Sequence, residues 1–270
     1  MSENNIVTKN YKKLAVQIAL NRLSFCVFDS LTNHSREIHE VQFNNTQSLE
    51  DQLWRAFVDF PQLNKTYDDV IVLHDNSLNT FVPKALFDVN ALGGYLQYNT
   101  KVFETDYFAS DIIEPYEIIN VHVPYVNVNN FLVDQFGSFD FKNINSVLTV
   151  KLLELSRNKF EKQVFVHFQK NHFEIIVADN AKLVLFNSFE YKTPEDFAYY
   201  LLFTLEQLQL NPEVVSVALL GEIEEADTRF QIAYRYIRNL TLLDTASIAD
   251  KFAVTESQAL NHFILLHACE

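Results

Sequence analysis

Apolar and polar positions follow the same order in two separate stretches of the chain. The later stretch begins with three apolar runs between residues 164 and 189, separated by short polar turns, which is typical of strands joined by hairpins. Residues 193–196 (Thr-Pro-Glu-Asp) then combine a capping hydroxyl, a proline at the first helical position and a carboxylate three residues after the cap. The pattern predicts a helix that ends at Asn211-Pro212, and then a strand over 214–220 that is apolar except for Ser216 and so buried on both faces.

The earlier stretch repeats this order. Three apolar runs lie between residues 14 and 43, and residues 48–51 (Ser-Leu-Glu-Asp) form the same kind of helix start. A short apolar run at 70–73 corresponds to the strand at 214–220, at the same offset as the two helix starts. The shared caps at one offset predict that the two stretches are copies of one structural unit.

Shorter elements are expected between and after the two copies. Val82-Pro83 opens a short helix, Asp88 caps a second one that Gly93-Gly94 interrupts, and residues 100–115 form an acidic and aromatic loop. The other expected elements are strands at 116–123 and 240–243, and helices at 126–136, 145–156, 230–237 and 255–266. We expect two domains, at residues 1–144 and 145–270, with an insertion near 95–125 in the first.

Two βββαβαβ halves with mixed sheets imply an α/β protein with a duplicated RNase H-like core, the arrangement of actin-like ATPases and sugar kinases. In its segment order and capped repeats, the whole chain resembles an uncharacterised bacterial protein family with an actin-like ATPase fold and no assigned activity. More distantly, it resembles the actin-like cytoplasmic scaffolds of type IV pilus and type II secretion systems. The resemblance implies two domains with a cleft between them.

Active actin-like proteins carry an Asp-x-Gly turn between the first two strands of each half, where the carboxylate holds Mg²⁺ and the glycine backbone cradles phosphate. The first hairpin of this chain has Ala19 at the carboxylate position and Asn21 at the glycine position. The second hairpin, residues 167–171 (His-Phe-Gln-Lys-Asn), has neither residue. We therefore expect no ATP hydrolysis, no cofactor and no metal ion.

The same resemblance indicates which residues would remain of a nucleotide cleft. Asn21, Arg22, Lys170 and Asn171 would face it, although all four are ordinary residues of hairpin turns. Gly221 ends a strand that resembles the one lying against adenosine in active members, but a single glycine is also a common strand terminator. A degenerate nucleotide cleft and purely structural roles stay open as two interpretations of these five residues.

An aromatic and acidic segment lies between residues 95 and 125. Tyrosine is frequent at protein interfaces because its ring is large and its hydroxyl tolerates water. The segment therefore suggests a partner-binding surface, and the alternative is a long loop packed over the core of the first domain. The candidate residues are Tyr95, Tyr98, Tyr107, Phe108, Tyr116 and Tyr125.

Composition narrows the classes of partner and location. The 270 residues carry a formal net charge of −14 and only 4 Gly, which disfavours duplex DNA, anionic membranes and phosphate-binding loops. No stretch has the length and apolarity of a membrane span or a signal peptide core. Cys26 and Cys269 are expected to be free thiols in a reducing cytosol. We expect a cytoplasmic protein with a protein partner and no nucleic acid.

Three functions follow from these observations. The first is a non-catalytic actin-like scaffold or protein-interaction module that has lost the motifs for nucleotide hydrolysis. The second is a weak ATP-binding switch that uses Gly221 and the Lys170 turn. The third is a metal-dependent nuclease, which needs three or four carboxylates around two metal ions.

The residues argue against the nuclease. Asp75 follows a buried strand, but Ala19 removes the carboxylate that the first strand should carry. Two pairs of histidines are spaced five residues apart, whereas ligands on one helical face are spaced three or four apart. These pairs are His167 with His172 and His262 with His267, and metal binding is not expected at either.

Overall fold

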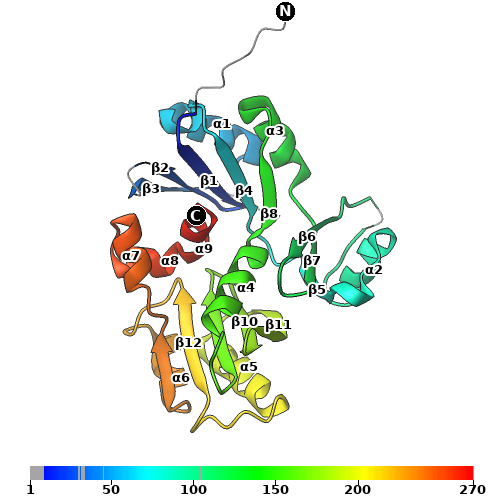
Figure 1. Ribbon diagram of the computed structural model, residues 1–270, viewed down its shortest axis with the longest axis vertical. Helices are drawn as coiled ribbons and strands as arrows, with labels where there is room; N and C mark the ends of the chain where they lie inside the picture. The colour runs from blue at the N-terminus through cyan, green and yellow to red at the C-terminus, as the bar shows by residue number, and fades with distance from the viewer. Residues whose placement is uncertain (1–8, 30, 32–33, 45, 104, 270) are drawn as a thin grey trace, which may run out of the picture.

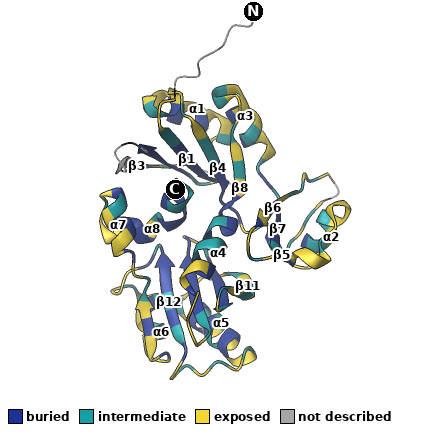
Figure 2. Cartoon of the chain, viewed as in Figure 1, coloured by how far each residue is buried: buried dark blue, intermediate teal, exposed yellow. Residues whose placement is uncertain are grey.

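The computed structural model describes residues 9–269 except 30, 32, 33, 45 and 104. Two five-stranded mixed sheets lie one beyond the other along the long axis, and a three-stranded sheet projects to one side (Figure 1). Buried residues concentrate in the strands, and exposed residues on the outer helices (Figure 2). We call the part around the first five-stranded sheet the first lobe, the part around the second the second lobe, and the projecting part the insertion.

The first lobe is built on the order β3-β2-β1-β4-β8. Strand β1 is antiparallel to β2 and parallel to β4, and β4 is parallel to β8. The strands are β1 (Lys12–Ala19), β2 (Arg22–Asp29), β3 (His34–Gln42), β4 (Asp69–His74) and β8 (Asp140–Asn143). The helices are α1 (Leu49–Asp59), η1 (Pro61–Asn64) and α3 (Val126–Phe136). Alternate β1 residues face opposite ways: Leu14 and Val16 share a core with α1 and α3, whereas Ala15 joins the core that contains the C-terminal helices.

The second lobe has the equivalent order β11-β10-β9-β12-β13, so the predicted duplication is confirmed strand for strand. Its strands are β9 (Gln163–Phe168), β10 (His172–Asp179), β11 (Lys182–Glu190), β12 (Ser216–Gly221) and β13 (Asn239–Leu242), with helices α5 (Pro194–Gln207) and α6 (Thr228–Tyr234). The two expected caps are also present. The Ser48 and Thr193 side chains accept hydrogen bonds from the backbone N–H groups of Asp51 and Asp196, respectively.

The insertion differs from the sequence prediction. It contains a sheet of order β5-β7-β6, formed by β5 (Asn79–Pro83), β6 (Ala109–Ile113) and β7 (Ile118–His122). The short helices η2 (Lys84–Leu86), η3 (Val89–Ala91) and α2 (Leu92–Leu96) cover it. The loop predicted at 100–115 is therefore wrong over β6, and strands β5 and β8 were not expected. Strand β6 contains Asp111, a poor strand former, which is buried and accepts a hydrogen bond from Asn143 N–H.

The C-terminal helices lie between the two lobes. The single helix predicted at 255–266 is two helices that meet at His262, α8 (Glu256–Asn261) and α9 (Phe263–Ala268), and α7 (Ala246–Phe252) was not expected. Helix α9 contacts β1, β2 and the connecting helix α4 (Ile144–Leu155). Both cysteines are free thiols, and Cys269 Sγ lies 3.6 Å from the Cys26 carbonyl oxygen. The end of the chain therefore packs on the first lobe. None of the helices in the described residues is long and apolar enough to span a membrane.

Candidate functional site

The β1–β2 and β9–β10 turns approach each other between the lobes. They line a cavity of about 590 Å³ together with residues of β3, α8 and the end of β12. The structure therefore brings together three of the predicted cleft residues, Asn21, Arg22 and Lys170. Asn171 instead lines a neighbouring hollow, and Gly221 lies just before the lining residue Glu222. The complete lining is Asn21, Arg22, Glu40, Gln42, Lys170, Glu222, Asn261 and His262.

Arg22 joins the two lobes through polar contacts. Its Nη2 lies 3.2 Å from Asp75 Oδ2 in the first lobe and donates to Gln169 Oε1 of the second lobe at 3.0 Å. Its Nη1 forms an ion pair with Glu222, which directly follows β12. Burial alone would lower the pKa of Arg22, but the carboxylates of Asp75 and Glu222 outweigh this effect and raise it. The guanidinium is therefore charged and held by both lobes.

Asp75 has every side-chain contact that a buried carboxylate requires. Its side chain is only 2% exposed, and besides Arg22 it accepts hydrogen bonds from Gln17 Nε2 and Gln169 Nε2, both at 2.8 Å. The backbone carbonyl of Asp75 accepts a further bond from the Tyr125 hydroxyl at 2.9 Å. Because its oxygens are engaged in this way, Asp75 is poorly placed to act as the metal ligand that a nuclease would need. We refer to Gln17, Arg22, Asp75, Gln169 and Glu222 as the inter-lobe network.

Charges in the cavity are mixed. Lys170 is exposed and has no ion partner among the described residues, but Glu40 and Glu222 also line the space. Burial lowers the pKa of His262, which favours its neutral form. No group of three or more His, Cys, Asp or Glu side chains in the described part of the chain is arranged to hold a metal ion. Among the described lining residues, Lys170 is thus a cation without an ion partner beside the two carboxylates of Glu40 and Glu222, which is a weak attraction for a polyphosphate.

Gly221 has a conformational role that is visible in the backbone. Its φ is +85°, and a Cβ at this position would lie 2.2 Å from the Phe168 carbonyl oxygen. The following residue, Glu222, donates its N–H to that same oxygen at 3.0 Å. A glycine is therefore required for β12 to end beside β9, whether or not a nucleotide binds here. The adenosine role of Gly221 stays a prediction.

The histidines of the second hairpin hold a buried carboxylate. Glu174 is fully buried on β10, its Oε2 lies 2.9 Å from His167 Nδ1, and its Oε1 lies 3.0 Å from His172 Nε2. The second contact lacks hydrogen-bond geometry, so we treat it as an attraction between charges. Burial would raise the pKa of Glu174, but the two histidines outweigh it and lower this pKa to about 2. The sequence did not indicate that this carboxylate lies between the paired histidines.

The predicted aromatic surface is divided by the insertion. Tyr98 and Tyr107 are 85% and 59% exposed, whereas Phe108 packs against the small core of the insertion. The Tyr95 hydroxyl donates a hydrogen bond to the Leu86 carbonyl oxygen. Tyr116 packs against the large core, and Tyr125 belongs to the first-lobe core and bonds to Asp75. Only Tyr98 and Tyr107 among the six candidates are open to a partner.

Several residues of the site were not found from the sequence. The expectation covered Arg22 but not its partners Asp75, Gln169 and Glu222, which lie 53, 147 and 200 residues away in the chain. One signal was present: Gln17 interrupts an apolar strand, and a buried polar residue needs a partner. That partner is Asp75, which follows β4 and lies 58 residues further along the chain, and no local pattern identifies it.

Solved structures share this fold. A Bacteroides thetaiotaomicron protein with an actin-like ATPase fold and unknown function matches with a TM-score of 0.84 and 21% identity, over 97% of this chain and 97% of that chain. The PilM–PilN type IV pilus biogenesis complex matches with a TM-score of 0.58 and 12% identity, over 95% and 97%. The cytoplasmic domain of EpsL, an inner membrane component of the type II secretion system of Vibrio cholerae, matches with a TM-score of 0.48 and 14% identity, over 87% and 86%. The predicted actin-like ATPase fold is confirmed.

No curated protein matches the sequence. A family profile described as "protein of unknown function (DUF3822)" matches residues 1–240, which is most of the chain. The chain therefore belongs to the DUF3822 family, and its structure has an actin-like ATPase fold.

Proposed function

We propose that this protein is a non-catalytic actin-like scaffold or interaction module, in which an internal ion network takes the place of a nucleotide between the lobes. The observation that carries the proposal is Arg22. Its guanidinium emerges from the first hairpin turn, where active members hold phosphate, and it pairs with Asp75 and Glu222. A bound nucleotide joins the lobes of an actin-like protein, and the inter-lobe network supplies such a link from the chain itself.

A protein partner fits this role. Tyr98 and Tyr107 present exposed rings on the insertion, where a partner could cover them. The solved complex of PilM with PilN is an assembly of two pilus biogenesis proteins on a similar fold, and we extend that kind of role to this chain. We place the protein in the cytoplasm, in keeping with the two free thiols.

A second candidate is the weak ATP-binding switch. The cavity of about 590 Å³ has room for a ligand, and Lys170 faces it with no ion partner in the described residues. Against this candidate, Lys170 is a single point charge, and the carboxylates of Glu40 and Glu222 would repel the phosphates. We therefore favour the scaffold.

Thermal unfolding with and without Mg-ATP separates the two candidates. A ligand present at 100 times its dissociation constant stabilises the folded state by about 2.7 kcal/mol, which corresponds to a rise in Tm of roughly 5–10 °C. The scaffold predicts no such rise with millimolar Mg-ATP, and phosphate release at the rate of the buffer alone. A rise of this size that is lost in Lys170→Ala would replace the scaffold with the switch.

A further inference from the structure

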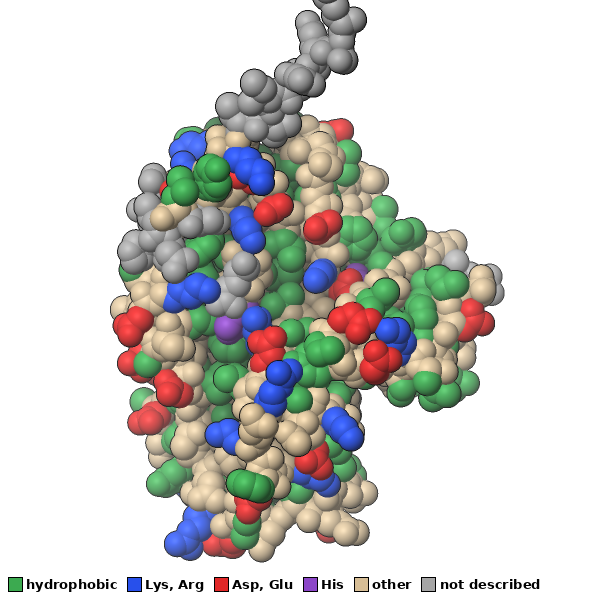
Figure 3. Space-filling model, in the orientation of Figure 1, with side chains coloured by type: hydrophobic (Ala, Val, Ile, Leu, Met, Phe, Trp, Pro, Cys, Tyr) green, Lys and Arg blue, Asp and Glu red, His purple; other side chains and the backbone are tan. Residues whose placement is uncertain are grey.

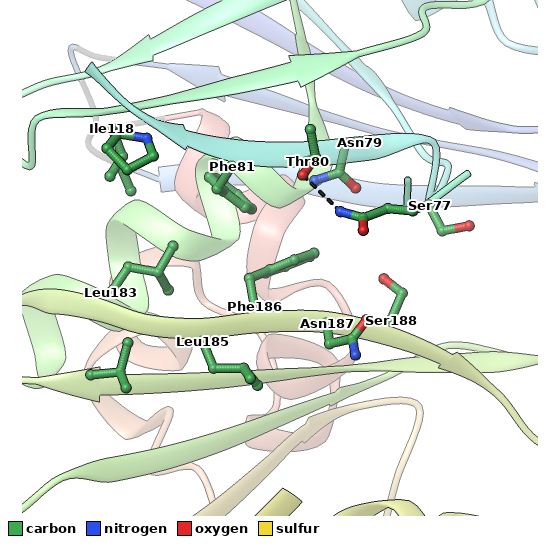
Figure 4. A pocket seen from close by; sticks show the side chains of 13 residues that line it. Ser77, Asn79, Thr80, Phe81, Ile118, Leu183, Leu185, Phe186, Asn187 and Ser188 are labelled. Atoms are coloured by element: carbon green, nitrogen blue, oxygen red, sulfur yellow. Dashed lines mark hydrogen bonds between the residues drawn. The ribbon is translucent and has the colours of Figure 1, made fainter. Parts of the chain in front are cut away.

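Two sheet edges face each other across a groove beside the insertion. Strand β5 is at one edge of the three-stranded sheet, and β11 is at one edge of the second-lobe sheet. A groove of about 350 Å³ separates them (Figure 4), and Figure 3 shows the recess where the insertion projects beside the second lobe. The walls of the groove thus come from strands that have a pairing partner on one side only, within the described residues.

The groove meets the backbone edge of β11. Its lining includes six consecutive residues of this strand, 183–188. Successive side chains of a strand point to opposite faces of the sheet, so a space that touches all six residues lies against the edge and not against one face. The unpaired N–H and C=O groups along that edge are a template for another strand.

The ladder identifies the groups that point into the groove. Tyr191 N–H donates to the Asn171 carbonyl, in register with the β10–β11 pairing. Bonded and non-bonded pairs alternate in an antiparallel ladder, so Asn187 also bonds to β10, whereas the backbone groups of Phe186 and Ser188 point away from it. Ser188 also lines the groove, and its buried hydroxyl has no hydrogen-bond partner within the described part of the chain.

The chemistry of the groove selects an uncharged occupant. None of the described residues that line it is charged, although the chain carries a formal net charge of −14. The only charged residues of β11 are at its ends, Lys182 and Glu190, whereas the equivalent edge strand β3 (HSREIHEVQ) carries three Arg or Glu residues. Internal charges usually protect an edge strand from pairing, and β11 has none.

The groove is also narrow and partly apolar. The rings of Phe81 on β5 and Phe186 on β11 meet across it with their centroids 4.7 Å apart (Figure 4). Leu183 extends this apolar wall, and polar Asn and Ser side chains lie at the other end. An extended segment would add one strand to this edge, whereas β11 of a second copy would bring the rest of its sheet with it.

We propose that an extended, uncharged segment of a partner protein pairs with the outer edge of β11 and places apolar side chains against Phe81 and Phe186. This inference rests on the proposed function as an interaction module and names the class of partner. Main-chain hydrogen bonds provide affinity in this mode of recognition, and the side-chain pockets provide specificity.

The test uses a phage-displayed library of random 12-residue peptides, selected on the full chain. Enriched peptides are synthesised, and their dissociation constants are measured by fluorescence polarisation. Ser188→Pro removes one N–H that points into the groove, and proline is tolerated where the N–H of an edge strand faces outward. Ser188→Ala is the matched control, because it keeps that N–H. Circular dichroism melting curves verify that each variant folds.

We expect uncharged peptides with alternating apolar residues, whose affinity falls at least tenfold in Ser188→Pro and changes less than threefold in Ser188→Ala. If Ser188→Pro does not fold, Val184→Lys decides the matter, since Val184 is 40% exposed and the lysine places a charge in the groove. Enriched peptides that bind both variants as they bind the original protein, or no enrichment at all, would overturn the inference. So would a wild-type dimer, measured by light scattering, that Ser188→Pro dissociates.

The melting curves also separate this inference from the proposed function. A stabilisation by Mg-ATP would overturn the scaffold role and leave the peptide data to be judged by themselves. Peptides whose affinity does not change in the β11 variants would overturn the proposed class of partner. The scaffold role would still be supported by the absence of nucleotide binding.

Discussion

Replacing Arg22 by methionine should destabilise the protein substantially, because the change removes the guanidinium that pairs with the buried carboxylate of Asp75. The Asp75 side chain is 2% exposed and the Arg22 side chain 15% exposed, so the pair is largely shielded from solvent. Removing one member of a buried pair costs about 3–5 kcal/mol. Two amide hydrogen bonds to Asp75 remain, from Gln17 and Gln169, so we expect the lower part of that range, about 3–4 kcal/mol.

Urea unfolding followed by circular dichroism measures this loss. The matched control is Arg55→Met, an exposed arginine of α1 whose replacement should cost less than about 0.5 kcal/mol. The double variant Arg22→Met/Asp75→Asn should be more stable than the sum of the two single changes implies, by about 1–3 kcal/mol. A cost below about 1 kcal/mol for Arg22→Met, or simple additivity in the double variant, would refute the idea that this buried pair stabilises the inter-lobe network.

Three further predictions concern other residues. Gly221→Ala should lower the free energy of unfolding in urea by at least about 3 kcal/mol, since its Cβ would lie 2.2 Å from a carbonyl oxygen. The control Gly94→Ala should be neutral or stabilising, because a Cβ there would have nothing within 4 Å. Equal effects of the two changes would contradict the backbone argument. Burial lowers the pKa of His74 from 6.5 to about 4. The contribution of neutral His74 to the free energy of unfolding is therefore complete above pH 6.5, and about 3 kcal/mol of it is lost as the pH falls towards 4. Urea unfolding between pH 6.5 and 4 should show this loss of stability in the original protein and a smaller loss in His74→Gln. Equal losses in the two proteins would exclude His74 as the cause. Tyr107→Ser should leave the Tm nearly unchanged, whereas Phe108→Ser should lower it by several degrees because that ring packs in the core of the insertion. A larger fall in Tm for Tyr107→Ser than for Phe108→Ser would contradict the burial of these two rings.

The duplicated fold was predictable because its signals are local. Hairpin turns, helix caps and apolar runs each occupy a few consecutive residues, and their order is repeated in the two halves. The caps at Ser48 and Thr193 illustrate this, since each side chain bonds to a backbone N–H only three residues later. Such features can be read from a short stretch of sequence because they do not depend on tertiary contacts.

The insertion and the inter-lobe network were less predictable for a physical reason. Strand β6 contains Asp111, whose polar side chain argues against a strand until its partners Asn143 and Ser146 are known. In the same way, Arg22 was expected in the cleft, but its ion partners come from other parts of the chain. Buried polar groups are defined by tertiary contacts, and these contacts carry no signature in a short window of sequence.

The central claim is that the cleft holds an internal ion network in place of a nucleotide, and direct titration of Mg-ATP into the protein tests it. Isothermal titration calorimetry should show no saturable heat, which corresponds to a dissociation constant weaker than about 1 mM. Arg22 and Glu222 would then remain paired across the lobes, as in the present structure. A micromolar dissociation constant that weakens at least tenfold in Lys170→Ala would contradict the claim and establish the cleft as a working nucleotide site.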